Sequence, residues 1–310
     1  NGKEFGIVEE DTIVQVGGNS IICWNIGQNT KDYIPCPRRN GYSAVATSYN
    51  NGLIAAAESG LQPSCQIYQM PGKKIVADFK MNTTLKCEGL AFSRDGKYLV
   101  IIGGLPDFNI SIYDLEAKKF LITEEQKLKH RKEFISVKFN PRSKNEFAIL
   151  SRHKVQFFSI LPAFQYRDQE DGGFNEGESD GGQNNFIDAW RFEVEEFDAM
   201  DVPVTEGGDG RVEFTNLTWD SQNRIFLCTN QKKLFHVTSK NPHVGKTLDL
   251  AAEPLSVVMT PRHILISLAD GVINWIKIEH PYEGAKPEDC FITIEEDIDK
   301  EYNFLEKLPQ

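Results

Sequence analysis

The stretch Leu85–Glu124 constrains the fold of this chain most strongly, because four short β-like runs follow one another within about forty residues. Apolar and polar residues alternate along these runs, and a period of two is the signature of a strand. The first two runs are joined by Asp95-Gly96, a pair suited to a tight hairpin because glycine accepts positive φ at no steric cost. The stretch therefore predicts a four-stranded sheet with strands at Cys87–Phe92, Tyr98–Ile102, Asn109–Asp114 and Lys119–Ile122.

The same pattern recurs along the chain, as it must if one sheet is to bury both of its faces. The ends of the third strands carry aromatic residues, spaced by 44, 45, 45, 77 and 40 residues, at Trp24, Tyr68, Tyr113, Phe158, Phe235 and Trp275. A period of roughly 40 to 45 residues with an aromatic-acid ending, best preserved in Tyr113-Asp114, is typical of WD-type β-propellers. We therefore predict an all-β, WD40-type β-propeller in which each four-stranded sheet is one blade.

Six blades can be recognised, and the remainder of the chain is too short for another. The predicted blades span Phe5–Pro37, Tyr42–Phe79, Leu85–Glu124, a fourth from Phe134 whose outer strand returns at Ala189–Val194, Val212–Leu250 and Leu255–Ile294. Ring closure removes exposed sheet edges, which are otherwise an aggregation hazard. We therefore expect residues 1–310 to be a single propeller, the N-terminal one of a longer protein, with a seventh blade incomplete at the C-terminal end. A six-bladed ring that closes within this chain is the alternative.

The long spacing inside the fourth blade is explained by an acidic insert at about residues 165–186, rich in Gly, Asp, Glu and Asn. Such a composition cannot bury enough apolar surface to offset the entropy of ordering, so a flexible segment is expected. From Arg167 to Arg211 there are 14 acidic and 3 basic residues, a net charge of −11 that equals the net charge of the whole chain. The net negative charge of the chain therefore comes from this one segment, and the rest of the domain has no net charge.

Motifs that carry chemistry are missing, and the nearest candidates have simpler interpretations. The six histidines form no HExxH or short pair, and no nucleophile-elbow, P-loop or dinucleotide-binding glycine pattern occurs. Asp168–Gly173 resembles the start of a calcium loop, but position twelve is Ser179 where such loops carry a bidentate glutamate. Six singly placed cysteines indicate buried reduced thiols. We therefore predict a protein that is not an enzyme and has no metal or cofactor, in a cytosolic-type compartment.

Basic residues cluster in the loops that a propeller brings to one face, namely those between second and third strands and those between blades. Exposed aromatic residues are not interleaved with them and no nucleic-acid motif occurs, so the pattern favours an acidic protein surface over a nucleic acid. No apolar run approaches the roughly 20 residues of a membrane span. The acidic insert starts on the opposite face, so an electrically two-sided domain is expected. The predicted partner-binding residues are Arg38, Arg39, Arg152, Lys154, Lys232 and Lys233.

Several short segments carry a family resemblance: Asp11–Val14 followed by Gly18–Ile22, the stretch from Asp95–Leu99 through Leu105–Phe108 to Ile112–Asp114, Phe139–Pro141 and Leu217–Trp219. Together they resemble the N-terminal propeller of ciliary WD-repeat proteins, in particular the cilia- and flagella-associated protein 43 family. The Leu-Pro-acid-aromatic loop before an aromatic strand end is the family feature that Leu105–Phe108 and Tyr113–Leu115 match. The related families 44 and 57 of the same nomenclature are alternatives.

The resemblance implies a non-enzymatic scaffold of the ciliary or flagellar axoneme, within the cytoplasm and cytoskeleton. It implies tandem propellers followed by a coiled coil, a paralogous WD-repeat tether subunit as partner, and a tether between inner-arm dynein heavy chains and the doublet microtubule that supports ciliary movement. Two other classes stay open from the residues alone. One is a cytoplasmic WD-repeat scaffold of another multiprotein assembly, and the other is a propeller hydrolase with a polar cluster in its central channel.

Overall fold

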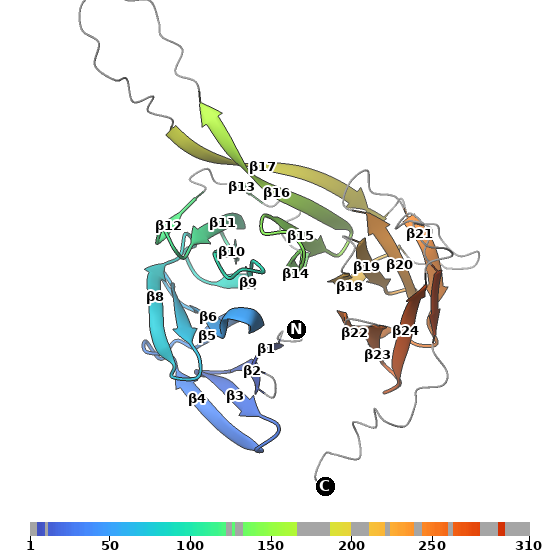
Figure 1. Cartoon of the computed structure of the whole chain (residues 1–310), viewed down its shortest axis with the longest axis horizontal. Helices are drawn as coiled ribbons and strands as arrows, with labels where there is room; N and C mark the ends of the chain where they lie inside the picture. Colours follow the sequence, from blue (N-terminus) through green and yellow to red (C-terminus); the bar gives the residue numbers. More distant parts are fainter. Residues whose placement is uncertain are drawn as a thin grey trace, which may run out of the picture.

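The computed structural model describes residues 5–9, 12–121, 126–127, 133–165, 187–199, 211–220, 224–238, 244–259, 263–279 and 291–294. These residues form six antiparallel sheets arranged in sequence order around a central opening, which is the predicted WD40-type propeller (Figure 1). Within each sheet the strands pair in the order of the sequence, from the innermost strand to the outermost. In the described part of the chain, no helix has the length and apolar character that crossing a lipid bilayer requires.

The first three sheets agree with the predicted blades. Sheet one contains β1 (Phe5–Glu9), β2 (Thr12–Gly17), β3 (Ser20–Asn25) and β4 (Thr30–Pro35). Sheet two contains β5 (Tyr42–Ser48), β6 (Leu53–Glu58), β7 (Ser64–Gln69) and β8 (Lys74–Lys80), with the 3-10 turn η1 (Tyr49–Asn51) between its first two strands. Sheet three contains β9 (Cys87–Phe92), β10 (Tyr98–Gly103), β11 (Asn109–Asp114), β12 (Lys119–Phe120) and β13 (Gln126–Lys127). Its predicted outer strand is thus split, because both β12 and β13 pair with β11.

The last three sheets follow the same plan. Sheet four contains β14 (Phe134–Phe139), β15 (Glu146–Ser151), β16 (Lys154–Gln165) and β17 (Ile187–Asp198). Sheet five contains β18 (Phe214–Trp219), β19 (Arg224–Thr229), β20 (Lys233–Thr238) and β21 (Val244–Asp249). Sheet six contains β22 (Pro254–Met259), β23 (His263–Leu268), β24 (Ile273–Glu279) and β25 (Phe291–Ile294).

The outer hairpin of sheet four is longer than predicted. β16 and β17 each have 12 residues, pair continuously from Lys154↔Asp198 to Gln165↔Ile187, and extend beyond the rim of the ring (Figure 1). Gln165, which was expected to begin the acidic insert, is therefore the last residue of a strand. The rest of the predicted insert, residues 166–186, lies outside the described residues.

All six aromatic residues of the predicted repeat lie on the third strand of their sheets, but two are out of register. Trp24, Tyr68, Tyr113 and Phe158 each face the second residue of the preceding strand. The corresponding position in sheet five is Val237, so Phe235 lies two residues earlier on the same face. In sheet six the corresponding residue is Ile276, so Trp275 points to the other face of its sheet. The expectation of equivalent places is wrong for these two residues.

The sheets in the middle of the series are buried on both faces, whereas the described residues cover the two end sheets on one face only. Every residue of β6, β10 and β19 is buried. In β2 and β23 buried residues alternate with partly or fully exposed ones. Trp24 and Trp275 both lie on the uncovered faces, because their neighbours Cys23 and Ile276 pack against sheets two and five. Figure 1 shows the ring open between these sheets.

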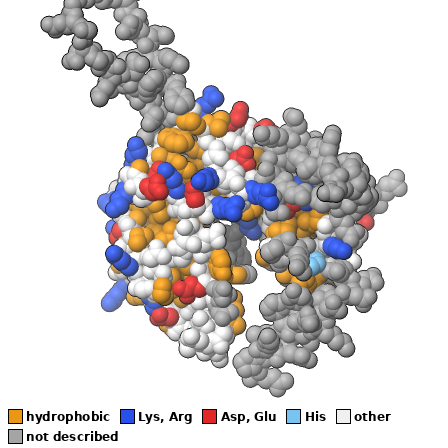
Figure 2. Space-filling view, in the orientation of Figure 1, with side chains coloured by type: hydrophobic (Ala, Val, Ile, Leu, Met, Phe, Trp, Pro, Cys, Tyr) orange, Lys and Arg blue, Asp and Glu red, His pale blue; other side chains and the backbone are white. Residues whose placement is uncertain are grey.

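The two faces of the ring differ in their connections. We call the loop face the one that carries the loops between sheets and the loops between second and third strands. We call the turn face the one that carries the turns between first and second strands; η1 belongs to it, and Figures 1 and 2 are drawn from this side. On the loop face, backbone bonds join neighbouring connections, such as Gly60 N to Leu85 O at 2.8 Å and Phe214 N to Arg152 O at 2.7 Å. These bonds fix the positions of the side chains predicted to bind a partner.

Candidate interaction surfaces

The six predicted partner-binding residues all lie on the loop face or at strand ends adjoining it, but four of them are already engaged by carboxylates. Lys154 at the start of β16 has a side chain only 17% exposed, with its Nζ 2.9 Å from Glu196 and 3.9 Å from Asp198. Lys233 at the start of β20 is 12% exposed and lies 3.4 Å from Asp249. These two cations stabilise pairs of adjacent strands.

The remaining four lie in the loops themselves. Arg152 is about half exposed and its Nη1 lies 3.1 Å from a carboxylate oxygen of Glu213. Lys232 is exposed, and its Nζ lies 3.4 Å from the carbonyl of Ala251. Arg39 is exposed, and no side-chain partner is found for it among the described residues. The loop face therefore presents fewer available cations than the sequence predicts.

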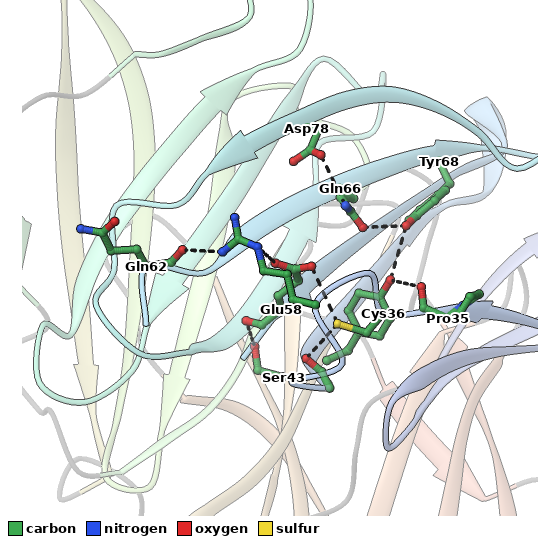
Figure 3. Close-up of polar contacts among 11 residues, drawn as sticks. Pro35, Cys36, Ser43, Glu58, Gln62, Gln66, Tyr68 and Asp78 are labelled. Carbon is green, nitrogen blue, oxygen red and sulfur yellow. Dashed lines mark hydrogen bonds and ion pairs between the residues drawn. The ribbon is translucent and has the colours of Figure 1, made fainter. Parts of the chain in front are cut away.

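Arg38 pairs with the buried carboxylate of Glu58, which Figure 3 labels, at the junction of sheets one and two. Its Nε lies 3.5 Å from Glu58, whose side chain is 1% exposed, and its Nη1 donates to the carbonyl of Gln62 at 3.3 Å. The thiol of Cys36 donates to the other Glu58 oxygen at 3.8 Å. Because an unpaired buried carboxylate is costly, Arg38 stabilises the fold at this junction.

A second polar chain lies beside this group in Figure 3. The hydroxyl of Tyr68 donates to Gln66 Oε1 at 2.7 Å, and Gln66 Nε2 donates to Asp78 at 3.4 Å. The hydroxyls of Tyr68 and Tyr42 lie 3.4 Å apart, and burial raises the pKa of both phenols. Both tyrosines therefore stay neutral at physiological pH and serve as hydrogen-bonding groups within the ring.

In the loop with the Leu-Pro-acid-aromatic pattern, Leu105–Phe108, one carboxylate forms several hydrogen bonds to the preceding loop. Asp107, between β10 and β11, accepts hydrogen bonds from the backbone N–H of Thr84 at 2.5 Å, from the Thr84 hydroxyl at 3.0 Å and from the Thr83 hydroxyl at 3.1 Å. Hydrogen bonds to a charged acceptor are among the stronger ones in proteins. The acid of the Leu-Pro-acid-aromatic pattern thus fastens sheet three to the loop that precedes it.

A cavity of about 540 Å³ opens on the loop face at the central channel. Ser43 in its wall donates its hydroxyl to the carbonyls of Ala57 and Glu58, both at 3.2 Å. Lys86 and Glu88 pair with each other at 2.6 Å. Within the described residues, no cluster of three or more His, Cys, Asp or Glu side chains could hold a metal ion. Ser43, Lys86 and Glu88 of this wall are thus engaged with one another or with the backbone, and Arg152, which also lines it, pairs with Glu213.

The thiols of four described cysteines are protonated in the folded protein. Burial raises the pKa of Cys23 to about 11 and those of Cys87 and Cys228 to about 12, and it raises the pKa of Cys65 as well. All four are free and buried, as the sequence indicates. Since the thiolate is the nucleophile, a thiol with a raised pKa is unreactive at neutral pH.

We therefore expect these four cysteines to resist modification by a thiol reagent at pH 8 in the native protein and to react once guanidinium unfolds it. Raising the pH toward 11 should begin to expose thiolate at Cys23 before Cys87 or Cys228, because its pKa is lower. Peptide mapping by mass spectrometry would identify the modified sites. Labelling of Cys87 in the native state at pH 8 at the unfolded rate would contradict the assignment.

The turn face carries cations that are not among the six predicted partner-binding residues. Arg94 and Arg142 occupy successive turns, between β9 and β10 and between β14 and β15, and both are exposed. Among the described residues neither side chain has an ion-pair partner. The acidic insert on which the expectation of a two-sided charge distribution rests lies outside the described residues, so that expectation stays a prediction. Aligning the repeats on their hairpin turns would have placed these arginines together.

Comparison with known proteins agrees with the fold and identifies the family. The propeller domain of Cps50 (Swd1) from Myceliophteria thermophila superimposes with a TM-score of 0.58 at 12% identity, over 82% of this chain and 70% of that one. A chain of the Mitotic Checkpoint Complex gives a TM-score of 0.59 at 10% identity, over 89% and 73%. At such low identity these structures show the β-propeller fold alone.

Three curated relatives carry ciliary names. They are cilia- and flagella-associated protein 44 of Trypanosoma brucei brucei (22% identity over 154 residues) and cilia- and flagella-associated protein 43 of Mus musculus (26% over 158) and Xenopus laevis (19% over 160). The matches cover 49%, 49% and 52% of this chain but only 9% to 10% of those proteins. The sequence model of the CFAP43 N-terminal domain matches residues 4–165, more than half of the chain. The chain therefore belongs to the CFAP43 N-terminal domain family of cilia- and flagella-associated proteins.

Proposed function

We propose that this chain is part of a non-enzymatic scaffold of the ciliary or flagellar axoneme, a tether subunit that links inner-arm dynein motor domains to doublet microtubules. The observation that carries the proposal is the family match over residues 4–165, to which the names of the curated relatives add the cilium or flagellum. The engaged groups of the loop-face channel support a binding role over a catalytic one. A cytoplasmic WD-repeat scaffold of another assembly is the alternative.

The proposed partners are proteins: a paralogous WD-repeat tether subunit, an inner-arm dynein heavy chain and the doublet microtubule. We place the contact with an acidic partner on the loop face, where Arg39 and Lys232 offer the most available charge. Arg38, Arg152, Lys154 and Lys233 take part through the loops that they hold in place. Exposed charges of this kind act mainly on the rate of encounter.

Reversing both available charges, in Arg39→Glu/Lys232→Glu, is expected to slow association with isolated doublet microtubules by several-fold at low salt and to flatten its dependence on salt. Both side chains are exposed, so the fold should be unaffected, and an unchanged melting temperature would confirm this. The matched control is Lys118→Glu/Lys119→Glu, two exposed lysines at the outer turn of sheet three, which makes the same change in net charge. Association at the wild-type rate across the salt series would place the doublet contact elsewhere.

We further propose that the ring is one propeller, completed by a seventh four-stranded sheet between sheets six and one. The support is the single-sided burial of β2 and β23 and the apolar residues that their sheets leave exposed, among them Leu255 at 60% and Ile273 at 58%. A sheet in this position would cover both tryptophans and would leave no sheet edge exposed at the opening of the ring. In a longer chain that includes the seventh sheet, the fluorescence of Trp24 and Trp275 should be protected from quenching by iodide. In residues 1–310 alone, iodide should quench the fluorescence of both.

A further inference from the structure

The turn face bears a hollow at the mouth of the central channel that combines positive charge with an apolar floor. Its volume is about 650 Å³, and the residues that line it come from sheets two to six. Arg94, Lys138 and Arg142 supply the charge. Val258, 45% exposed, and the partly buried Phe139 and Met259 supply the apolar part. Figure 2 shows lysine and arginine side chains gathered along the edge of this central hollow.

Two described carboxylates near this mouth are engaged within their own turns. Asp95 accepts the hydroxyl of Ser93 at 2.7 Å and the backbone N–H of Lys97 at 3.2 Å. Asp220 lies in the lining, but it is 3% exposed and its Oδ2 is 2.5 Å from Arg224 Nη2. These two acids are thus held inside the turns, whereas the side chains of Arg94 and Arg142 are exposed. The described part of the mouth therefore presents positive charge.

The turns that carry the two arginines are close together and well ordered by hydrogen bonds. Lys144 of one turn lies 3.8 Å from Asp95 of the other, which places the two turns side by side. In the second turn, Asn140 is fully buried and its Oδ1 accepts the backbone N–H of Arg142 at 2.9 Å. A ligand that binds two fixed turns orders little of the protein, which favours affinity.

We propose that this channel mouth binds an extended acidic segment of a protein partner, with carboxylates on Arg94 and Arg142 and one apolar side chain against Val258 and Met259. Guanidinium groups take carboxylates in bidentate pairs, which matches two neighbouring arginines. The site is separate from the loop-face contact and does not depend on the ciliary role.

A nucleic acid fits this mouth less well. Three cations make a small footprint for a phosphate backbone, whose binding grows with the number of charges neutralised. Stacking of bases needs an exposed aromatic face, and Trp219, the largest aromatic residue in the lining, is 5% exposed, with its Nε1 donating to the Lys138 carbonyl at 3.2 Å. The apolar floor instead suits a peptide side chain.

The test measures how a fluorescein-labelled, glutamate-rich peptide with one central leucine binds to the full 310-residue chain. Fluorescence anisotropy reports the binding. Arg94→Glu/Arg142→Glu should weaken binding at least about tenfold, since two charge-assisted contacts become repulsive. Arg94→Gln/Arg142→Gln should give a smaller loss, and Val258→Asp should weaken the leucine peptide. The matched control Lys118→Glu/Lys119→Glu, with the same change in net charge at the exposed outer turn of sheet three, should bind like wild type.

Three results would overturn the proposal. The first is unchanged binding by Arg94→Glu/Arg142→Glu with an unchanged melting temperature. The second is an equal loss in the Lys118→Glu/Lys119→Glu control, which would mean that the peptide senses only net charge. The third is displacement of the peptide by single-stranded oligothymidylate at equal or lower concentration, which would favour a nucleic-acid ligand. A negative result in the peptide assay would not affect the conclusion of the doublet assay, because the doublet assay tests residues on the opposite face.

Discussion

Replacing Arg224 with alanine is expected to lower the free energy of unfolding by about 3–5 kcal/mol. Arg224 and Asp220 are 2% and 3% exposed at the turn between β18 and β19, with Nε and Nη2 of the arginine 2.6 and 2.5 Å from the same carboxylate oxygen. Removing the guanidinium leaves a buried carboxylate without its cation, whereas most substitutions cost far less. Chemical denaturation of the wild-type and mutant chains measures the difference.

The double variant Asp220→Asn/Arg224→Met is the control for this prediction. The amide still accepts the backbone N–H of residue 224, which now bonds Asp220 at 2.9 Å, and methionine fills part of the space over the Phe226 ring. Because neither residue is then charged, the double variant should be at least about 2 kcal/mol more stable than Arg224→Ala. A loss under about 1 kcal/mol in Arg224→Ala would mean that solvent reaches the carboxylate.

Replacing Phe235 with alanine should also cost about 3–5 kcal/mol, because the ring is fully buried where sheets four and five meet. Its centroid lies 6.3 Å from Phe197 and 6.2 Å from Phe214, so its removal leaves a cavity lined by two other rings. The transfer of the ring to water and the cavity both contribute to the loss. Urea unfolding with an unchanged m-value would measure it.

Trp275→Ala provides the matched comparison, since Trp275 lies on the same strand of the next sheet but on its uncovered face. With the side chain only partly buried, the loss should be nearer 1 kcal/mol in residues 1–310. In a longer chain that supplies the proposed seventh sheet, the same substitution should cost about as much as Phe235→Ala. Equal costs for Trp275→Ala in both chains would argue against the seventh sheet.

The sheets could be predicted from the sequence because strand period and hairpin turns are local properties. Asp95-Gly96 and the alternation from Asn109 to Asp114 are sufficient to place β9 to β11. The register of Phe235 and Trp275 was not predictable from spacing, since a slip of one residue moves a side chain to the other face and depends on loop geometry. The two-stranded outer edge of sheet three is another case, because β12 and β13 are each only two residues long.

The candidate surfaces were less predictable than the fold, because charge pairing is decided by residues far apart in the chain. Lys154 pairs with Glu196, which lies 42 positions later in the chain, and Arg38, in the loop after sheet one, pairs with Glu58 of sheet two. A count of basic residues in loops cannot show which of them are already neutralised. The turn-face arginines could be found only by overlaying repeats, because Arg94 and Arg142 are isolated cations in the linear sequence.

The one-sided burial of the end sheets has a consequence for how this domain comes apart. Each sheet packs only on its neighbours, so stability follows a nearest-neighbour chain of interfaces, as in linear repeat proteins. A closed ring has no first or last unit, whereas this open series has two. Amide hydrogen exchange should therefore be fastest in β2 and β23 and slowest in β10, β15 and β19, with fraying that proceeds inward from both ends. The proposed seventh sheet would hold the two end sheets together, and its release would loosen them while sheets three to five stay folded.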